Sequence, residues 1–172
     1  MTRAALTALL ASTAIVAAGC GGSGGANTKP QQSHTTAADA VGSVQLEAAV
    51  RRALRENSRL SLYTLWHDSV PVWATQSTRG PALVELRHSA AQRRRQGIHI
   101  KHLSGRLAIV SVQLDPSYLA ATAVVSAHDR VRPYRKGHPL GRAITSNERA
   151  RVELRRLGRK PIFVVWRLTL LP

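Results

Sequence analysis

Residues 148–171 read ERARVELRRLGRKPIFVVWRLTLL and predict a β-hairpin. In the first ten residues, apolar Ala150, Val152 and Leu154 alternate with charged residues, which is typical of a strand with one buried and one solvated face. The sequence GRKP predicts a turn at residues 158–161. The apolar stretch 162–171 then predicts a returning strand. We expect the following residues to share one face of that strand: Ile162, Val164, Trp166 and Leu168.

The preceding segment also has strand character. We expect strands over residues 98–103, 107–114 and 118–128, with a turn at Asp115–Ser117 between the last two. A Pro- and Gly-rich excursion over residues 132–147 separates them from the C-terminal hairpin. This order predicts an antiparallel meander in the second half of the chain.

Helical patterns precede these strands. Apolar spacing predicts a helix from Ser43, as its N-cap, to Asn57, and a second short helix over residues 60–67. A turn and a short strand at residues 71–73 follow. Residues 80–97, GPALVELRHSAAQRRRQG, predict a third helix with Pro81 in its first turn and Gly97 at its end. The fold class is therefore α+β, with N-terminal helices packed on an antiparallel sheet.

The N-terminus has the pattern of an export signal. Thr2 and Arg3 are followed by an uncharged stretch, residues 4–18, which is short for a membrane span. Small residues precede Cys20, the chain's one cysteine, and this resembles a bacterial lipobox with Ala17 in place of the usual Leu. The resemblance implies that Cys20 is lipidated and anchors the protein at the outer side of the cell membrane. The alternative is an ordinary secretory signal with a chance cysteine.

The segment after Cys20 is rich in Gly, Ser, Thr, Gln and Ala, which predicts a flexible tether. We divide the chain into a lipoprotein signal peptide at residues 1–19, a lipidated cysteine and linker at 20–43, and one domain at 44–172. The net charge of +16 comes from 25 Lys and Arg against nine Asp and Glu. Arg-rich composition from a GC-rich genome explains such a charge, and so does attraction to a polyanion.

The motifs LYTLWHDSVPVW, residues 62–73, and STRGPALVELRHSAA, residues 77–91, come before hairpin strands that end in a Trp-bearing strand. This order resembles the nuclear-transport-factor-2-like superfamily, which includes ketosteroid-isomerase-like and SnoaL-like proteins. The resemblance implies a cone-shaped, cystatin-like domain whose curved sheet wraps around the helices, with a pocket at the wide end. Members include isomerases, cyclases, dehydratases and proteins without known activity, so the fold does not decide the function.

Such a pocket would be lined by aromatic residues from several segments, which alternatively form the core. These residues are Tyr63, Trp66, Trp73 and Trp166. Enzymatic relatives need a base beside an oxyanion-stabilising donor. Weak catalytic candidates are Tyr63, Asp68, His128 and Asp129, and the further bases are His99 and His102. No residue-by-residue match to a family catalytic set exists, so we expect no enzyme activity and no cofactor.

His99 and His102 lie three residues apart on an expected strand and therefore face opposite sides, which argues against a shared metal ion. The run Arg93–Arg95 suits the C-terminal end of a helix dipole. Arg149, Arg151 and Arg155, with Arg167 across the hairpin, predict a basic strip that Glu153 interrupts. No aromatic residues interleave with these arginines, so we do not expect single-stranded nucleic acid as a partner.

Two functions from different classes follow. The first is an envelope lipoprotein whose non-enzymatic domain binds an apolar small molecule or an envelope protein. The second is a docking module for anionic lipid or an anionic envelope polymer, which uses the arginine strip. A SnoaL-like isomerase or a hydrolase ranks third, and a homodimer is compatible with all three.

Overall fold

The computed structural model describes residues 37–172, with side chains from residue 42 onward. The signal peptide, Cys20 and most of the expected linker lie outside the described residues. No helix within residues 37–172 has the length and hydropathy needed to cross a membrane.

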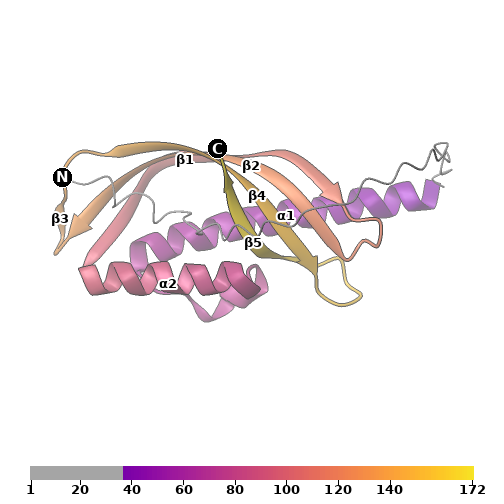
Figure 1. The fold of residues 1–172 in the computed structure, drawn as a ribbon, viewed down its shortest axis with the longest axis horizontal. Helices are drawn as coiled ribbons and strands as arrows, with labels where there is room; N and C mark the ends of the chain where they lie inside the picture. Colours follow the sequence, from indigo (N-terminus) through magenta and orange to yellow (C-terminus); the bar gives the residue numbers. More distant parts are fainter. Residues whose placement is uncertain (1–36) are drawn as a thin grey trace, which may run out of the picture.

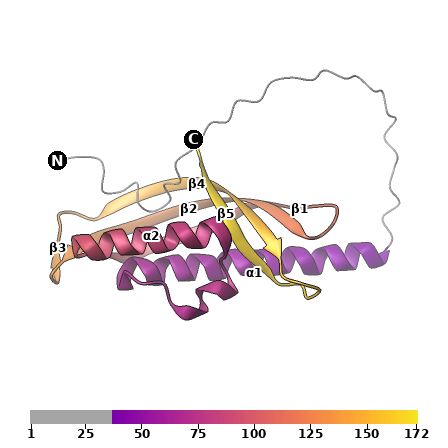
Figure 2. The ribbon, with the colours of Figure 1, turned by 60° about the horizontal axis from the view of Figure 1, so that its bottom comes forward.

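Two helices and a five-stranded antiparallel sheet form the fold, which confirms the α+β class (Figure 1). The helical elements are α1 (Ala37–His67), a short 3-10 helix η3 (Val72–Gln76) and α2 (Gly80–Gln96). The strands are β1 (Ile98–Leu114), β2 (Ala120–Arg135), β3 (His138–Pro139), β4 (Ile144–Arg156) and β5 (Phe163–Leu171). The sheet order is β1-β2-β4-β5, with β3 paired to β2. Both helices lie on the same side of the sheet, and the strands arch over them (Figures 1 and 2).

Helix α1 is one continuous helix of 31 residues, so the prediction of two helices that part after Asn57 was wrong. Ser43 lies inside α1 and is not its N-cap. Two polar side chains beyond Asn57 bond back to the helix backbone. Ser61 Oγ donates to the Asn57 carbonyl oxygen at 3.0 Å, and Thr64 Oγ1 donates to the Leu60 carbonyl oxygen at 2.8 Å. The helix ends at His67, and the next residue, Asp68, has a left-handed φ of 48°.

The strand expected at residues 71–73 is also wrong, because Val72–Gln76 forms the helix η3. The prediction for α2 is confirmed, with Pro81 in its first turn. Gly97 closes α2 at φ 62° and ψ 32°, and its N–H bonds to the carbonyl oxygens of Arg93 and Arg94.

The meander is confirmed, but its strands are longer than expected. The two strands predicted over residues 98–114 are one strand, β1, with register irregularities near Leu103 and Val110. Strand β2 continues through Arg135 into the expected excursion. The turn at Asp115–Ser117 is present, and the Ser117 N–H donates to Asp115 Oδ1 at 2.9 Å.

The C-terminal hairpin pairs β4 with β5. Ala150, Val152 and Leu154 are at most 2% exposed, which confirms the predicted buried face of β4. The face predicted for β5 is wrong. Glu153 pairs with Arg167 while Leu154 pairs with Val165, so Trp166 is the extra residue of a β-bulge and the alternation changes there. Ile162 precedes the strand and is exposed.

The main core lies between α1 and the helix-facing side of the sheet. Val50 and Leu54 of α1 pack among Ala123, Val152 and Val165 from three strands, all of them at most 4% exposed. Burial of this apolar surface is the main stabilising contribution to the fold. The second half of α1 continues along the same side of the sheet and forms the wall of a cavity.

Candidate ligand-binding cavity

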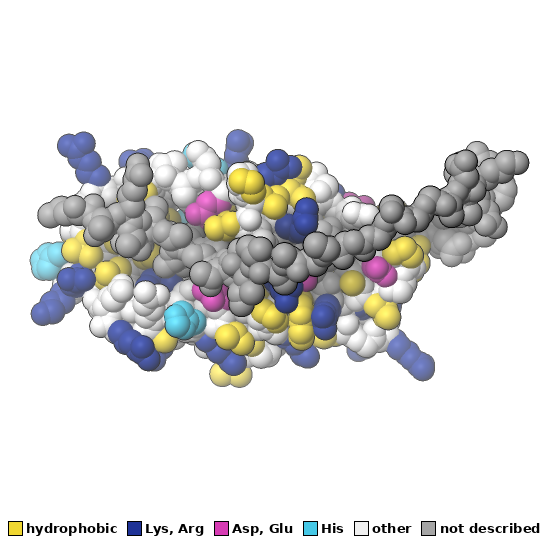
Figure 3. Space-filling view, in the orientation of Figure 1, with side chains coloured by type: hydrophobic (Ala, Val, Ile, Leu, Met, Phe, Trp, Pro, Cys, Tyr) yellow, Lys and Arg dark blue, Asp and Glu magenta, His cyan; other side chains and the backbone are white. Residues whose placement is uncertain are grey.

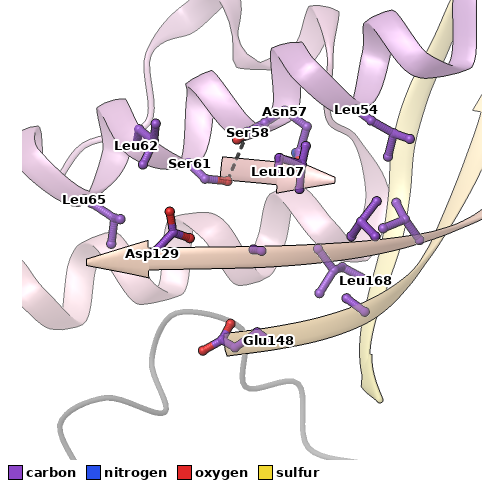
Figure 4. Close-up of a pocket in the computed structure, with 14 residues that line it drawn as sticks. Leu54, Asn57, Ser58, Ser61, Leu62, Leu65, Leu107, Asp129, Glu148 and Leu168 are labelled. Atoms are coloured by element: carbon purple, nitrogen blue, oxygen red, sulfur yellow. Dashed lines mark hydrogen bonds between the residues drawn. The ribbon is translucent and has the colours of Figure 1, made fainter. Parts of the chain in front are cut away.

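A cavity of about 90 Å³, room for several water molecules, lies between α1 and the helix-facing side of the sheet (Figure 4). Helix α1 contributes Leu54, Asn57, Ser58, Ser61, Leu62 and Leu65. This spacing of three and four residues places all six on one face of the helix. The strands contribute Leu107, Val125, Ala127, Asp129, Glu148, Ala150, Val152 and Leu168.

Small side chains account for the space. Ser58 and Ser61 on α1 face a part of the sheet that carries Ala127 and Ala150, and Ala127 pairs with Glu148 across β2 and β4. Larger side chains at these four positions would close the gap between the helix and the sheet. The residues are therefore apolar or small along most of the cavity wall.

Both carboxylates of the cavity lining lie toward one end. In Figure 4 Asp129 and Glu148 share that end with Leu62 and Leu65 of α1, and Leu54 and Leu168 lie toward the other end. The lining contains these two carboxylates and no Lys or Arg. The cavity lining is therefore acidic, although the chain as a whole has a net charge of +16.

Asp129 is held by a histidine from the neighbouring strand. His102 Nε2 lies 3.0 Å from Asp129 Oδ1, and both side chains are only partly exposed. Gly105 makes room for this pair, because a Cβ at Gly105 would collide with Asp129 Oδ1 and lie 2.7 Å from His102 Nε2. The missing side chain at Gly105 thus positions the carboxylate at the cavity.

Glu148 is half-buried, and burial is the main reason that its pKa is raised above the ordinary value. The negative charge of Asp129 raises the pKa of Glu148 further. A positively charged group placed between the two carboxylates would favour the ionised form of Glu148 and so oppose the rise of its pKa. The carboxylate end of the cavity therefore favours a cation or a hydrogen-bond donor.

The four aromatic residues expected to line a pocket do not line this cavity, nor do they form the core. Tyr63, Trp66 and Trp73 are 36–45% exposed. Tyr63 stacks on His67 with ring centroids 4.1 Å apart, and Trp66 lies edge-on to Tyr134. Trp166 lies beneath the Arg155 guanidinium, 4.0 Å from its ring centroid.

The structure does not bring the catalytic candidates together. Asp129 alone among them reaches the cavity, and His128 points to the opposite face of β2, where its Nδ1 contacts Asn147. Tyr63 is on the aromatic surface of α1. Asp68 is buried beside Arg93, and its Oδ1 accepts a bond from Arg93 Nε at 3.1 Å. Asp68 thus pairs with a cation that ties α1 to α2.

His99 and His102 contact different carboxylates. His99 Nδ1 lies 2.5 Å from Asp68 Oδ2, at angles that are poor for a hydrogen bond, whereas His102 faces Asp129. Among residues 37–172, no three side chains of His, Cys, Asp or Glu converge as a metal site would require.

Sequence reasoning selected Asp129 but missed Glu148 and the α1 face. Glu148 was taken as the first residue of an alternating strand, and its position in that alternation places it on the buried face with Ala150 and Val152. The sequence signal for this site was therefore Glu148 itself, a charged residue at a position where the alternation of β4 predicts an apolar one.

Comparisons with known proteins identify the fold and not the activity. No protein-family model matches the chain, and no curated protein matches it. A solved structure, the intermembrane space region of the chloroplast protein ARC6, is similar at a TM-score of 0.61 and 13% sequence identity. The match covers 71% of this chain and 93% of that one. At this identity the likeness supports the α+β fold alone.

Proposed function

We propose that the chain is an exported, lipid-anchored protein of the cell envelope whose domain binds a small amphipathic molecule without catalysis. The anchor is Cys20, and the ligand site is the cavity between α1 and the sheet. The observation that carries the binding function is the cavity itself, with apolar walls and two carboxylates at one end. The assignment to the nuclear-transport-factor-2-like superfamily, with its cone shape, rests on the sequence motifs and is part of this proposal.

The cavity chemistry specifies the class of ligand. Leucine and valine side chains favour an aliphatic or ring-shaped apolar body. Asp129 and Glu148 favour a head that donates hydrogen bonds and carries positive charge, because a cation would offset the repulsion between them. A carboxylate head would be repelled at the same place. The ligand is thus an apolar molecule with an amine or a similar donor.

The first experiment compares three probes of equal chain length by isothermal titration: decylammonium, decanol and decanoate. The protein is the full chain carrying Cys20→Ser, so that its own acyl groups are absent. We expect decylammonium to bind most tightly and decanoate least tightly. Equal affinity for decanoate and decylammonium would contradict the proposal.

Two variants locate the site. Glu148→Gln should reduce the preference for decylammonium over decanol by about tenfold or more, since a charge-assisted contact is worth roughly 1.5–3 kcal/mol. Glu85→Gln on α2, away from the cavity lining, is the matched control and should leave that preference unchanged. Ala150→Leu should weaken all three probes by filling the cavity. Ala91→Leu, at an exposed position on α2, is the matched control for the added bulk.

A further inference from the structure

The two faces of the sheet differ in charge. Side chains alternate along each strand, and the register between strands assigns each residue to a face. Asp129 and Glu148 lie on the helix-facing side. The outer face carries seven exposed basic residues: Lys101, Arg106, Arg130, Arg149, Arg151, Arg155 and Arg167. Glu153 is the one acidic residue of the four long strands on that face. We call these seven residues the basic sheet face.

Most of this charge is uncompensated. Within the described residues, no carboxylate lies within 4.0 Å of Lys101, Arg106, Arg130, Arg149 or Arg151. Arg167 is 4.0 Å from Glu153 Oε1, with both side chains about half exposed, so this pair is weak. In Figure 3, Lys and Arg side chains (dark blue) likewise outnumber Asp and Glu (magenta) on the visible surface. The basic sheet face therefore attracts anions.

Many other residues of this face on β1 and β2 are small: Ser104, Ala108, Ser111, Thr122 and Ser126. Val124 lies opposite Arg151 on the same face, and β1 exposes Leu103 and Val110 at its two register irregularities. No helix of the described residues covers this side of the sheet (Figures 1 and 2). A broad surface on which long basic side chains outnumber the exposed apolar ones suits a flat anionic layer, because the basic side chains reach the lipid headgroups.

We propose that the basic sheet face lies on the anionic lipid surface of the membrane that holds the anchor. This inference rests on the proposed anchoring at Cys20 and does not depend on the cavity ligand. Sixteen residues separate Cys20 from α1, and even a fully extended chain of that length spans no more than about 60 Å. The domain thus stays near the membrane, which raises the effective concentration of the lipid surface. Docked in this way, the protein turns its helical layer away from the membrane.

The test measures vesicle binding without the lipid anchor. Full chain carrying Cys20→Ser is sedimented with vesicles of phosphatidylcholine, alone or with about 30% phosphatidylglycerol. Pure phosphatidylcholine reports any binding through the N-terminal apolar stretch. We expect at least tenfold tighter binding to the anionic vesicles, and a loss of this difference at high salt. Equal binding to both vesicle types would overturn the proposal.

Charge reversal locates the surface. Arg149→Glu with Arg151→Glu should lower the affinity for anionic vesicles at least about tenfold, because two attractive charges become repulsive. Arg52→Glu with Arg55→Glu, on the exposed side of α1, makes the same change in net charge and should have less than a threefold effect. An equal loss in both pairs would mean that net charge alone acts, which overturns the proposal. Arg106→Glu with Arg130→Glu should reproduce the loss if the first pair misfolds.

A gain of binding completes the test. Glu153→Lys removes the acidic residue of the outer face and should raise the affinity for anionic vesicles, with circular dichroism confirming that the variant is folded. Competition identifies the partner: duplex DNA or soluble polyphosphate that binds the basic sheet face more tightly than the vesicles, at equal phosphate and salt, would overturn the lipid assignment.

Discussion

Arg93 of α2 donates from its Nε to Asp68 Oδ1 at 3.1 Å, and the two side chains are only 6% and 3% exposed. Arg93 Nη2 also donates to the Thr64 carbonyl oxygen at 2.9 Å. Burial lowers the pKa of Arg93, while the hydrogen bond and the charge of Asp68 raise it. This buried ion pair therefore joins the C-terminal ends of α1 and α2, and each of its two charges compensates the other.

Replacement of Arg93 should strongly destabilise the fold. Arg93→Met leaves the Asp68 carboxylate buried without its guanidinium partner, and the loss of one partner of a buried pair costs about 3–5 kcal/mol. Urea unfolding followed by circular dichroism measures this free energy. Arg95→Met, at an exposed position two residues away, is the control and should change it by no more than about 0.5 kcal/mol.

The double variant Arg93→Met with Asp68→Asn tests the cause. Because it removes both charges, it should recover part of the stability lost in Arg93→Met. If the double variant is less stable than the single one by the full cost of a second independent change, the two charges do not compensate each other.

This pair illustrates a limit of sequence-based prediction. The run Arg93–Arg95 was interpreted as positive charge that suits the C-terminal end of a helix dipole, and Asp68 was considered as a base. Their contact joins residues 25 positions apart across two helices, and no local pattern encodes it. Periodicity correctly predicted α2 and the buried face of β4. Both features depend on which side of a single helix or strand is buried, and the spacing of apolar residues reports that directly.

The errors have local physical causes. The first helix was predicted to end at Asn57, but Asn57 Nδ2 bonds to Thr78 Oγ1 at 2.7 Å and α1 continues. The bulge at Trp166 moves the face of β5 by one residue, and alternation alone cannot show a bulge. The cavity could not be predicted, because it depends on which small residues of α1 and the sheet face each other.

Gly105 should be intolerant of a side chain. Gly105→Ala places a Cβ against Asp129, His102 and the His128 carbonyl oxygen, which forces a shift and should cost about 1–3 kcal/mol. Thermal unfolding measures the loss. Gly42→Ala in α1 is the matched control, because nothing lies within 4 Å of that Cβ. It should stabilise the protein by about 0.5–1 kcal/mol. A neutral Gly105→Ala would show that the His102–Asp129 pair does not need this space.

Glu148 should make stability depend on pH. Its pKa is raised in the folded state, so its favourable contribution is complete below the ordinary pKa of 4.5. The contribution is lost as the pH rises through the folded-state pKa. Glu148→Gln, which mimics the protonated form, should therefore gain melting temperature relative to the parent as the pH rises above 4.5.

The same comparison in an Asp129→Asn background separates the two causes of the shift. Burial acts first and Asp129 second, so the advantage of Glu148→Gln should shrink there and not disappear. A pH-independent difference between the parent and Glu148→Gln would mean that the pKa of Glu148 is not raised.

The contact between Gly80 and Trp166 gives the last prediction. Gly80 begins α2 with φ at 57°, and a Cβ there would lie 2.7–2.8 Å from carbon atoms of the Trp166 ring. Gly80→Ala therefore combines left-handed backbone strain, about 1–2 kcal/mol, with a collision against the bulged residue of β5. Gly97→Ala introduces the backbone strain without a collision, since φ is 62° and nothing lies within 4 Å of the added Cβ.

The two variants should accordingly differ in their urea midpoints. Gly80→Ala should unfold at a clearly lower urea concentration than Gly97→Ala and should alter the Trp166 fluorescence, which Phe substitutions at Trp66 and Trp73 would isolate. Equal midpoints would mean that the Trp166 ring moves aside at little cost. In that case the β5 bulge would not hold the ring against the start of α2, and the link between α2 and the sheet would depend on the backbone bonds of Ser77 and Arg79 to Val165.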